Sequence, residues 1–451
     1  MDLTAAFAAS GAKAMAYAVI SSLLLAGGSH APDFAMFTLI RSTLGLLNYA
    51  SLGIAPAFIR QLAQSLALGS KTPGGAAPIS PQRLYASAVY PALLIGAVAL
   101  LLLLVYSFNF DSIHKVPPTL LQYAPWSAFF VGMAMLFRLL SDIPGGWLQA
   151  THKISLDNIL LMSADLAWPI LTWVLLRSTP TPLLAASIAF CICYFGLALA
   201  RLVAAGVHGA PIRSSPRDVD RPMALHLLGF GLLLTISQLS DFLYAPTDFL
   251  LINWFLTPEH LTDYSVVVQL DAGLLLLTSA VSTVLYPRAS RAVAIQDVAT
   301  LRRYYLRGTI LTAAMLIIVG IVLIIVAKPL LLIWLKTDRP GARAILPLLL
   351  LHTVIGGSIA PARAILFAAD KARVFAISAV AAGVINVVIS GTLLLYTDLG
   401  LVAVITGTVV AVFIRSVIFM PWYTMHVLRH LPASGGGAAK IDPPELQPRA
   451  K

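Results

Sequence analysis

The sequence predicts an all-α polytopic membrane protein with about 12 transmembrane helices in two pseudo-symmetric six-helix bundles. Of its 451 residues, 59% are hydrophobic and only 11% are charged, whereas a soluble domain carries about 25% charge. A soluble enzyme is therefore excluded. Twelve helices of about 20 residues need about 240 apolar residues, and 59% of 451 is about 266. The apolar residues thus suffice for a dozen spans and leave little for another domain.

Long apolar runs set the positions of the spans. The first run does not read as a signal peptide, because its start lacks a positive charge and its only lysine, Lys13, lies inside the run. The predicted spans are residues 5–27, 34–59, 84–107, 121–144, 156–177, 183–205, 224–254, 264–286, 308–335, 344–367, 374–396 and 400–425.

The connections between spans predict the orientation of the chain. The three longest, 60–83, 206–223 and 287–307, all fall on one side of the membrane. If the N-terminus is inside, the inner segments carry 20 of the 30 Lys and Arg residues, Arg201 among them, and the outer segments carry five. Basic residues are retained on the cytoplasmic side, so both termini are expected to be cytoplasmic. The net charge of +11 then records topology and does not indicate a nucleic-acid partner.

An internal repeat supports a division into two halves. Residues 263–290 follow residues 33–60 at an offset of 230, which pairs Asp33 with Asp263 and Arg41 with Asp271. An even number of helices per half makes both halves enter the membrane in the same direction, as in transporters with parallel repeats.

The expected organisation has four parts. Residues 1–205 form an N-terminal six-helix bundle, 206–223 a cytoplasmic linker, 224–431 a C-terminal six-helix bundle, and 432–451 a disordered cytoplasmic tail. The Gly/Pro/Ser-rich stretch 69–82 is expected to be a flexible loop.

Four residue patterns, in this order and spacing, carry a family resemblance. They are the acidic-aromatic start and Leu-Gly-Ile-Ala-Pro-Ala-Phe-Ile-Arg end of 33–60, Gly-Trp-Leu-Gln-Ala-Thr-His-Lys at 146–153, Pro-Thr-Asp at 246–248, and Gly-Val-Ile-Asn at 383–386. The chain resembles the multidrug/oligosaccharidyl-lipid/polysaccharide (MOP) flippase superfamily, and most closely its Wzx-like polysaccharide-biosynthesis branch for O-antigen and exopolysaccharide. The resemblance implies a MOP/MATE-like fold. Twelve spans disfavour the lipid II branch, which usually has fourteen, and leave the drug-antiporter branch open.

Basic residues inside spans are candidates for substrate binding, because ionisable groups in a bilayer usually face a cavity or a partner. Arg41 suits a diphosphate, whose oxygens its planar donors grip bidentately; the alternatives are a pair with Asp271 or snorkelling to the surface. Arg415 lies too deep to snorkel easily. The resemblance implies that Lys13 shares the same cationic cavity, with snorkelling as its alternative.

A second group of span residues is expected to act in gating or ion coupling. Arg138 and Asp142, four apart, are expected to pair on one helix face near the cytoplasmic mouth. Buried carboxylates beside a proline kink can take up H⁺ or Na⁺, or pair with Arg41 or Arg415. The candidates for gating or ion coupling are Arg138, Asp142, Asp165, Asp241, Asp248 and Asp271.

The leading functional hypothesis is a flippase that translocates undecaprenyl-diphosphate-linked oligosaccharide repeat units across the bacterial cytoplasmic (inner) membrane by alternating access. The alternative is a MATE-type cation-coupled multidrug antiporter. An enzyme is not expected, because no outer loop is large enough to fold into a catalytic site, and no cofactor or metal site is expected. The expected partners are the lipid-linked oligosaccharide, membrane lipids and a glycan polymerase or export machinery.

Overall fold

The computed structural model describes residues 2–25, 31–45, 47, 53–68, 80–229 and 245–430. All regular secondary structure within these residues is helical, and residues 221–229 form one further helix. The other helices are α1 (Asp2–Leu25), α2 (Ala31–Leu44), α3 (Ile54–Leu68), α4 (Pro81–Phe108), α5 (Phe110–Ile113), η2 (Pro118–Leu120), α6 (Ala124–Ala150), α7 (Ile154–Leu175), α8 (Pro182–Val207), η3 (Pro216–Asp218), α10 (Ala245–Phe255), α11 (Pro258–Ala294), α12 (Val298–Leu335), α13 (Pro340–Gly357), α14 (Ala360–Ala368), α15 (Ala372–Tyr396), α16 (Leu401–Phe413), the π-helix η4 (Ile414–Phe419) and α17 (Met420–His430).

Nine helical stretches in the described part of the chain are long and apolar enough to cross a membrane. The three other predicted spans correspond to α1, to α2 with α3, and to 221–229 with α10. The predicted all-α architecture with about twelve spans is therefore confirmed. Residues 69–79 of the predicted flexible loop and the tail 432–451 lie outside the described residues.

The structure corrects the second predicted span, 34–59. Instead of one helix it contains α2, which ends at Leu44, and α3, which begins at Ile54. Gly53, directly before α3, has a φ of +63°, a conformation that side-chain-bearing residues rarely adopt and that a right-handed helix cannot include. The chain therefore starts a new helix there and continues to Leu68, beyond the predicted end of the span.

The predicted connection 287–307 is mostly helical. α11 continues to Ala294 and α12 begins at Val298, so only a short turn separates them. Asp297 stabilises the new helix start by accepting a hydrogen bond from the backbone N–H of Thr300 at 2.9 Å. The segment contains one proline, Pro287, and no glycine. The two helices therefore continue through it, beyond their apolar portions.

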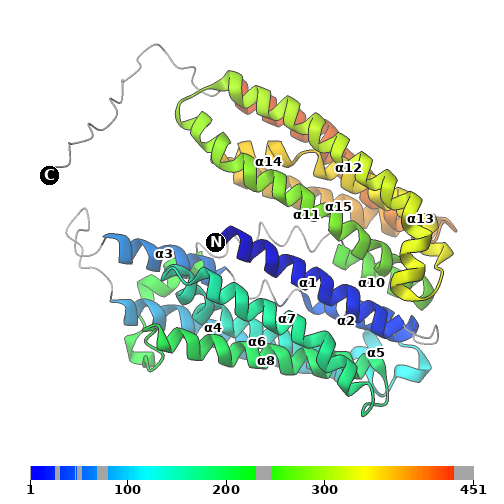
Figure 1. Cartoon of the computed structure of the whole chain (residues 1–451), viewed down its shortest axis with the longest axis horizontal. Helices are drawn as coiled ribbons and strands as arrows, with labels where there is room; N and C mark the ends of the chain where they lie inside the picture. Colours follow the sequence, from blue (N-terminus) through cyan, green and yellow to red (C-terminus); the bar gives the residue numbers. More distant parts are fainter. Residues whose placement is uncertain are drawn as a thin grey trace, which may run out of the picture.

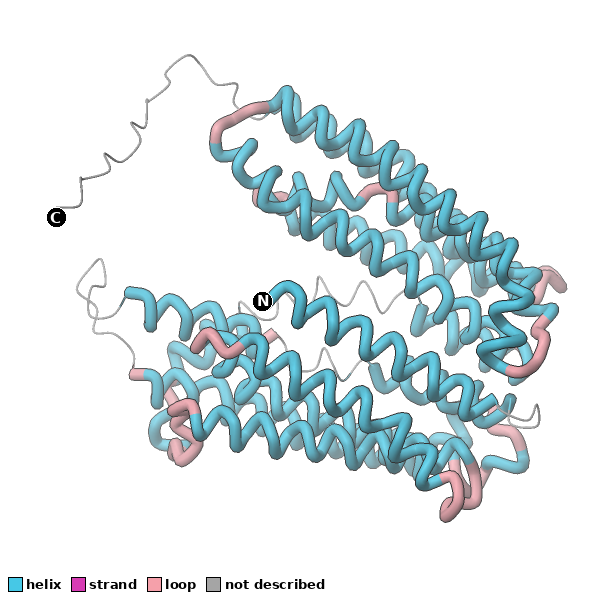
Figure 2. Tube along the Cα trace, viewed as in Figure 1, coloured by secondary structure: helices cyan, strands magenta, loops and turns pink. Residues whose placement is uncertain are grey.

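The helices gather into two groups, which Figure 1 shows as the blue-to-green and the green-to-red halves of the chain. In the first group α6 packs on α8 and α1 on α7; in the second α15 packs on α16 and α11 on α13 and α14. The two groups converge at the end that carries α5, α10 and α13, and diverge toward the end where the N-terminus of α1 lies (Figures 1 and 2).

Hydrogen bonds join the two groups at the converging end. Asn253 of α10 donates through Nδ2 to the carbonyl of Lys115 at 3.1 Å and accepts the Lys115 N–H at Oδ1 at 3.2 Å. Close by, Thr262 of α11 donates to the carbonyl of Ala31 at the start of α2, at 3.0 Å. These contacts hold the bundles together at one end of the molecule.

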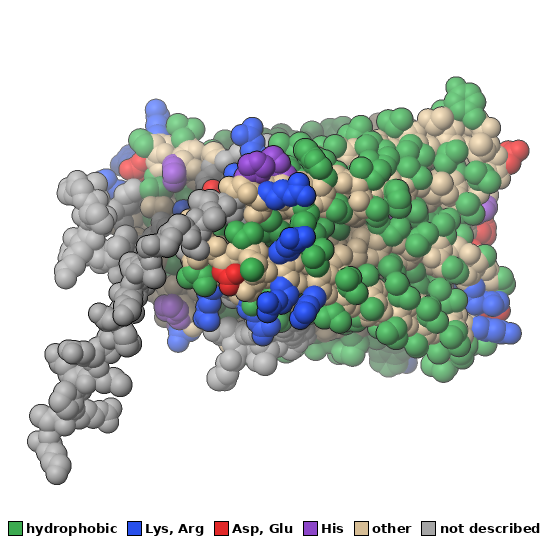
Figure 3. Space-filling model, turned by 90° about the horizontal axis from the view of Figure 1, so that it is seen from above, with side chains coloured by type: hydrophobic (Ala, Val, Ile, Leu, Met, Phe, Trp, Pro, Cys, Tyr) green, Lys and Arg blue, Asp and Glu red, His purple; other side chains and the backbone are tan. Residues whose placement is uncertain are grey.

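The outer surface is apolar where a bilayer would contact it. On α12 the side chains of Ile310, Ile318, Ile325 and Ile333 are 63–72% exposed. Their spacing of seven or eight residues keeps them on one side of the helix. Figure 3 shows apolar side chains covering the middle of this face, with Lys and Arg gathered toward one end. Such a surface requires lipid around it.

The connection between the two halves packs against the first bundle. Tyr90 of α4 donates to the carbonyl of Ser214 at 2.8 Å, and Ser87 of α4 accepts the N–H of Asp220 at 2.9 Å. Gln82, at the start of α4, donates to Asp218 Oδ2 at 3.0 Å. The linker 206–223 is thus an ordered part of the first bundle's surface.

Candidate functional site

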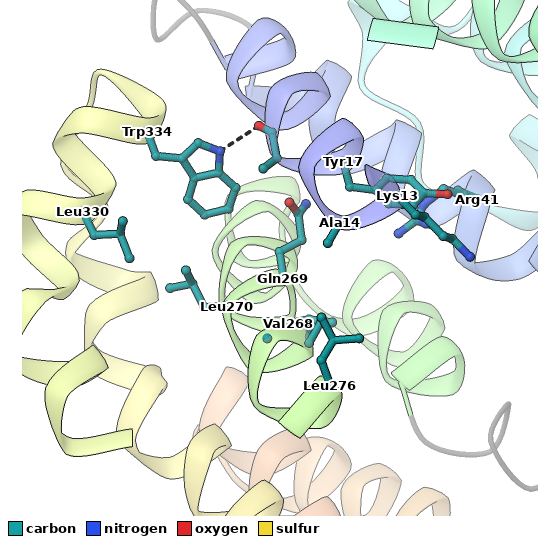
Figure 4. Close-up of a pocket in the computed structure, with 13 residues that line it drawn as sticks. Lys13, Ala14, Tyr17, Arg41, Val268, Gln269, Leu270, Leu276, Leu330 and Trp334 are labelled. Carbon is teal, nitrogen blue, oxygen red and sulfur yellow. Dashed lines mark hydrogen bonds between the residues drawn. The ribbon is translucent and has the colours of Figure 1, made fainter. Parts of the chain in front are cut away.

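A cluster of basic and aromatic side chains lies midway along α1 and in the last turn of α2. The Arg41 guanidinium of α2 lies over the ring of Tyr17 of α1, with Cζ 3.9 Å from the ring centroid. Lys13 is one helical turn before Tyr17, so its side chain projects from the same face of α1. Figure 4 shows Lys13, Tyr17 and Arg41 grouped together. Helix geometry therefore brings together two of the three cations predicted for a substrate cavity.

This cluster lines a cavity of about 790 Å³ between the two bundles. Across from it, Gln269 of α11 accepts a hydrogen bond from Ser21 of α1 at 2.7 Å, and Trp334 of α12 donates through Nε1 to the carbonyl of Ala18 at 2.7 Å (Figure 4). The residues that line the cavity are Lys13, Ala14, Tyr17, Ala18, Arg41, Val268, Gln269, Leu270, Ala272, Gly273, Leu276, Leu330 and Trp334.

Further charged side chains lie within the first bundle, near Lys13. Arg138 of α6 and Asp165 of α7 both lie close enough to act electrostatically on Lys13. The Asp165 carboxylate, which is 6% exposed, accepts a hydrogen bond from the Tyr194 hydroxyl at 2.9 Å. Three cations and one carboxylate thus lie in this part of the first bundle.

The predicted pairing of Arg138 with Asp142 is not the ion pair that forms. Asp142 pairs with Arg201 of α8, with Oδ1 3.1 Å from Nη1. Arg201 also donates to both carboxylate oxygens of Asp157 of α7, at 2.8 and 3.1 Å. Arg201, predicted to lie in an inner segment, is a buried residue of α8 and only 3% exposed. Its guanidinium pairs with carboxylates of neighbouring helices instead of extending to water at the end of α8.

A glycine makes this close approach possible. A Cβ at Gly145 of α6 would lie 2.9 Å from Arg201 Cζ and 3.0 Å from Asp157 Oδ1. Only a residue without a side chain leaves room there for the guanidinium between α6, α7 and α8.

The second bundle contains a buried polar network around Asp248 of α10. The carboxylate accepts hydrogen bonds from Tyr264 of α11 at 2.7 Å, from Asn386 of α15 at 2.9 Å and from Thr408 of α16 at 3.0 Å. All four residues are at most 3% exposed. Four helices therefore converge on one carboxylate whose partners are all uncharged.

Asp271 of α11 faces the second bundle and does not pair with Arg41. Its Oδ2 lies 4.0 Å from Nε2 of His352 on α13, and the residue is 4% exposed. The sequence repeat aligns Arg41 with Asp271, but Arg41 lies over Tyr17 and Asp271 lies beside His352, so the alternative pairing predicted between them does not form.

Arg415 lies apart from the cavity. It sits in the π-helix η4, where its Nε donates to Ser378 of α15 at 3.2 Å and its Cζ is 4.5 Å from the ring centroid of Phe375. It is not among the residues that line the cavity between the bundles. Asp241, predicted for ion coupling, lies outside the described residues.

The structure shows which charges face the cavity. The candidates in the predicted spans comprise four basic and five acidic residues, a balance that does not discriminate between cationic and anionic substrates. Among the described residues that line the cavity, Lys13 and Arg41 are basic and none is acidic. The side of the cavity formed by α1 and α2 is therefore basic.

Sequence reasoning missed several residues of the site. Tyr17, Gln269 and Trp334 line the cavity, and Asn386 and Thr408 surround Asp248. Asn386 was visible as a polar residue in an otherwise apolar span. The described residues contain no group of three or more His, Cys, Asp or Glu side chains placed to hold a metal ion.

Comparison with known proteins finds one matching family model. Residues 199–339 match a family model described as a polysaccharide biosynthesis protein. No curated protein matches the chain at a significant level.

Solved structures with the same fold cover nearly the whole chain. The inward-facing conformation of a multidrug resistance MATE family transporter of the MOP superfamily aligns with a TM-score of 0.71 at 13% identity, over 92% of this chain and 95% of that one. The lipid II flippase MurJ in an inward closed conformation aligns with a TM-score of 0.70 at 12% identity, over 95% and 90%. An outward-facing MATE family transporter aligns with a TM-score of 0.60 at 13% identity, over 94% of both chains.

At these identities the likeness establishes the fold, a multi-pass membrane fold shared with MATE transporters and MurJ. Residues 199–339 are in addition similar to a polysaccharide biosynthesis family. Both findings agree with the resemblance carried by the sequence patterns.

Proposed function

We propose that the protein flips undecaprenyl-diphosphate-linked oligosaccharide repeat units from the cytoplasmic to the outer leaflet of the bacterial inner membrane. The observation that carries this proposal is the cavity between the bundles, with Lys13 and Arg41 on its wall. Each lies about 15 Å along its helix from the first residue, by the rise of about 1.5 Å per residue. That depth is about half of the 30 Å hydrocarbon core.

The chemistry of the cavity suits a diphosphate. Buried cations at mid-membrane are costly unless an anion accompanies them. Arg41 presents planar donors for phosphate oxygens, and its contact with Tyr17 holds the guanidinium in place. The substrate crosses without any covalent change, so the protein acts as a transporter and not as an enzyme.

The contacts between the bundles support transport by alternating access. Hydrogen bonds from Asn253 and Thr262 close one end, while the bundles diverge toward the end where α1 begins (Figure 1). The higher TM-score with the inward-facing relative than with the outward-facing one supports an inward-open state. Both termini are placed on the cytoplasmic side, to which the cavity opens in this state. The lipid tail of the substrate stays in the bilayer. A glycan polymerase is the proposed recipient of the product at the outer leaflet.

Removing the cavity cations tests the proposal. In cells that depend on this protein for glycan export, Lys13→Ala and Arg41→Ala should each lower export at least tenfold, whereas Arg41→Lys should retain part of it. The matched control is Arg177→Ala, just after the end of α7, since Arg177 also stacks on an aromatic ring, Trp173, at 5.0 Å, but is not among the residues that line the cavity. Normal export by both cavity variants, at normal membrane levels, contradicts the proposal.

We propose Asp248 as the residue that binds a coupling ion, H⁺ or Na⁺. The support is its burial and its three uncharged hydrogen-bond partners, which leave the carboxylate without a neutralising side chain. Asp248→Asn should keep the fold and abolish the ion dependence of transport in proteoliposomes. Steps in pH and in Na⁺ concentration distinguish the two ions, and an unchanged dependence on both rules out Asp248.

The alternative is a cation-coupled multidrug antiporter. The acidic residues of the second bundle and the likeness to MATE structures favour it. Expression in a drug-sensitive strain decides between the two: raised resistance to cationic drugs supports the antiporter, and unchanged resistance with restored glycan export supports the flippase.

A further inference from the structure

The cavity has a second end, formed by Trp334 and Gln269. Binding of a diphosphate at Lys13 and Arg41 does not account for these two side chains. Trp334 lies in the last turn of α12, and its indole N–H is satisfied by the carbonyl of Ala18 at 2.7 Å. The hydrogen bond uses the only polar atom of the ring, so the indole can offer only its apolar surface to a ligand. Figure 4 shows the indole and the Gln269 amide on the same side of the cavity.

The distance between the two ends matches one sugar ring. Ala18, which anchors the indole, is five residues beyond Lys13 on α1, which is about 7.5 Å along the helix axis. A pyranose ring joined to a diphosphate therefore reaches the indole while its phosphates stay at Lys13 and Arg41. Gln269 lies on the facing helix α11, where it is anchored by Ser21 at 2.7 Å.

The pairing of an aromatic face with an amide suits a saccharide. The C–H face of a sugar packs on an aromatic ring, and its hydroxyls both donate to and accept from an amide, which carries both kinds of group. An isoprenoid tail makes no use of an amide. Leu276 and Leu330, also on the cavity wall, are better suited to the first isoprene units.

We propose that Trp334 and Gln269 form a subsite for the sugar attached directly to the diphosphate. This inference rests on the proposed flippase function and adds to it the place where the glycan is recognised. The ring of Trp334 stacks on the sugar and Gln269 binds a hydroxyl, so the protein distinguishes a glycosylated lipid carrier from the bare carrier.

Two short-chain probes test the subsite on the purified full-length protein in detergent: farnesyl diphosphate, and farnesyl diphosphate carrying one N-acetylglucosamine or one galactose. Calorimetry gives the ratio of the two affinities. In the wild type at least one glycosylated probe should bind about tenfold more tightly than the bare one, since stacking and one hydrogen bond contribute about 1.4 kcal/mol. Trp334→Leu and Gln269→Leu should each bring that ratio toward one.

A conservative variant separates recognition from a structural role. Trp334→Phe keeps an aromatic face but loses the bond to Ala18, so most of the ratio should survive. Trp173→Leu, which changes a tryptophan on the outside of α7, should leave the ratio at the wild-type value. Melting temperatures establish that each variant is folded.

Three other results of the binding experiment would contradict the subsite or the proposed function. If the wild type binds bare and glycosylated probes equally, the sugar subsite is refuted while the diphosphate cavity stands. If Trp334→Leu weakens both probes equally, the indole contacts the lipid tail and the subsite is again refuted. If neither probe binds the wild type, the proposed function itself fails.

Discussion

The buried pair between Arg201 and Asp157 allows a quantitative prediction about the first bundle. Arg201→Met removes two hydrogen bonds to Asp157, at 2.8 and 3.1 Å, and one to Asp142 at 3.1 Å. Asp157 is 1% exposed, so its buried charge would lose its cation and keep only the amide of Gln149, at 2.8 Å, as a side-chain partner. Breaking a buried pair in this way costs about 3–5 kcal/mol. The free energy of unfolding, measured by titration with a denaturing detergent, should fall by that amount.

Two further variants test the reasoning behind this magnitude. The Asp142 side chain is 32% exposed, so Asp142→Asn, which weakens the other arm of the same arginine, should cost no more than about 1 kcal/mol. The double variant Arg201→Met/Asp157→Leu removes both buried charges and should recover at least half of the loss. A cost below about 1 kcal/mol for Arg201→Met, or a double variant no more stable than the single one, would refute the argument from buried charge.

Three further predictions follow from other parts of the molecule. A Cβ at Gly407 would lie 2.1 Å from Ser390 Oγ and 2.8 Å from its backbone N, so Gly407→Ala should destabilise the protein by about 1–3 kcal/mol in the same titration; an unchanged stability would mean that α15 and α16 separate easily. Asn253→Ala removes two hydrogen bonds to Lys115, worth about 1–3 kcal/mol together, and should populate a state opened at that end, seen as longer distances between spin labels on α5 and α10. Hydrogen bonds from a backbone N–H and a glutamine lower the pKa of Asp218, so its contribution to docking the linker is present above the ordinary carboxyl pKa of about 3.9 and is lost as the pH falls through the lowered value; amide protection in the linker that does not change between pH 6 and pH 2 contradicts this.

Much of the fold follows from the sequence because the bilayer imposes one simple rule. Each backbone polar group in a membrane must be satisfied within its own helix, so a long apolar run such as 84–107 predicts a helix, and α4 (Pro81–Phe108) confirms it. The rule fails outside the bilayer. The charged segment 287–307 is not apolar, yet α11 and α12 extend through it, because a helix outside the bilayer does not need apolar side chains and the cap at Asp297 supports the start of α12.

The candidate site was only partly predictable. Lys13 and Arg41 stand out as cations within apolar runs, and they do lie on one cavity. Arg415 carries the same signal but points at Phe375 within the second bundle. Gln269 and Trp334 carry no such signal, since an uncharged polar residue and an interfacial tryptophan are ordinary features of membrane helices.

The sequence by itself determined the class of the protein and the approximate number and order of its spans, because hydropathy is a local property of the chain. Only the tertiary structure decided which charges meet. The four basic and five acidic candidates in the spans are nearly equal in number, but the partner of each depends on how the helices are rotated and packed. Arg201 joins Asp157 from another helix, Arg41 turns toward Tyr17 and away from Asp271, and the wall of the cavity becomes basic for that reason.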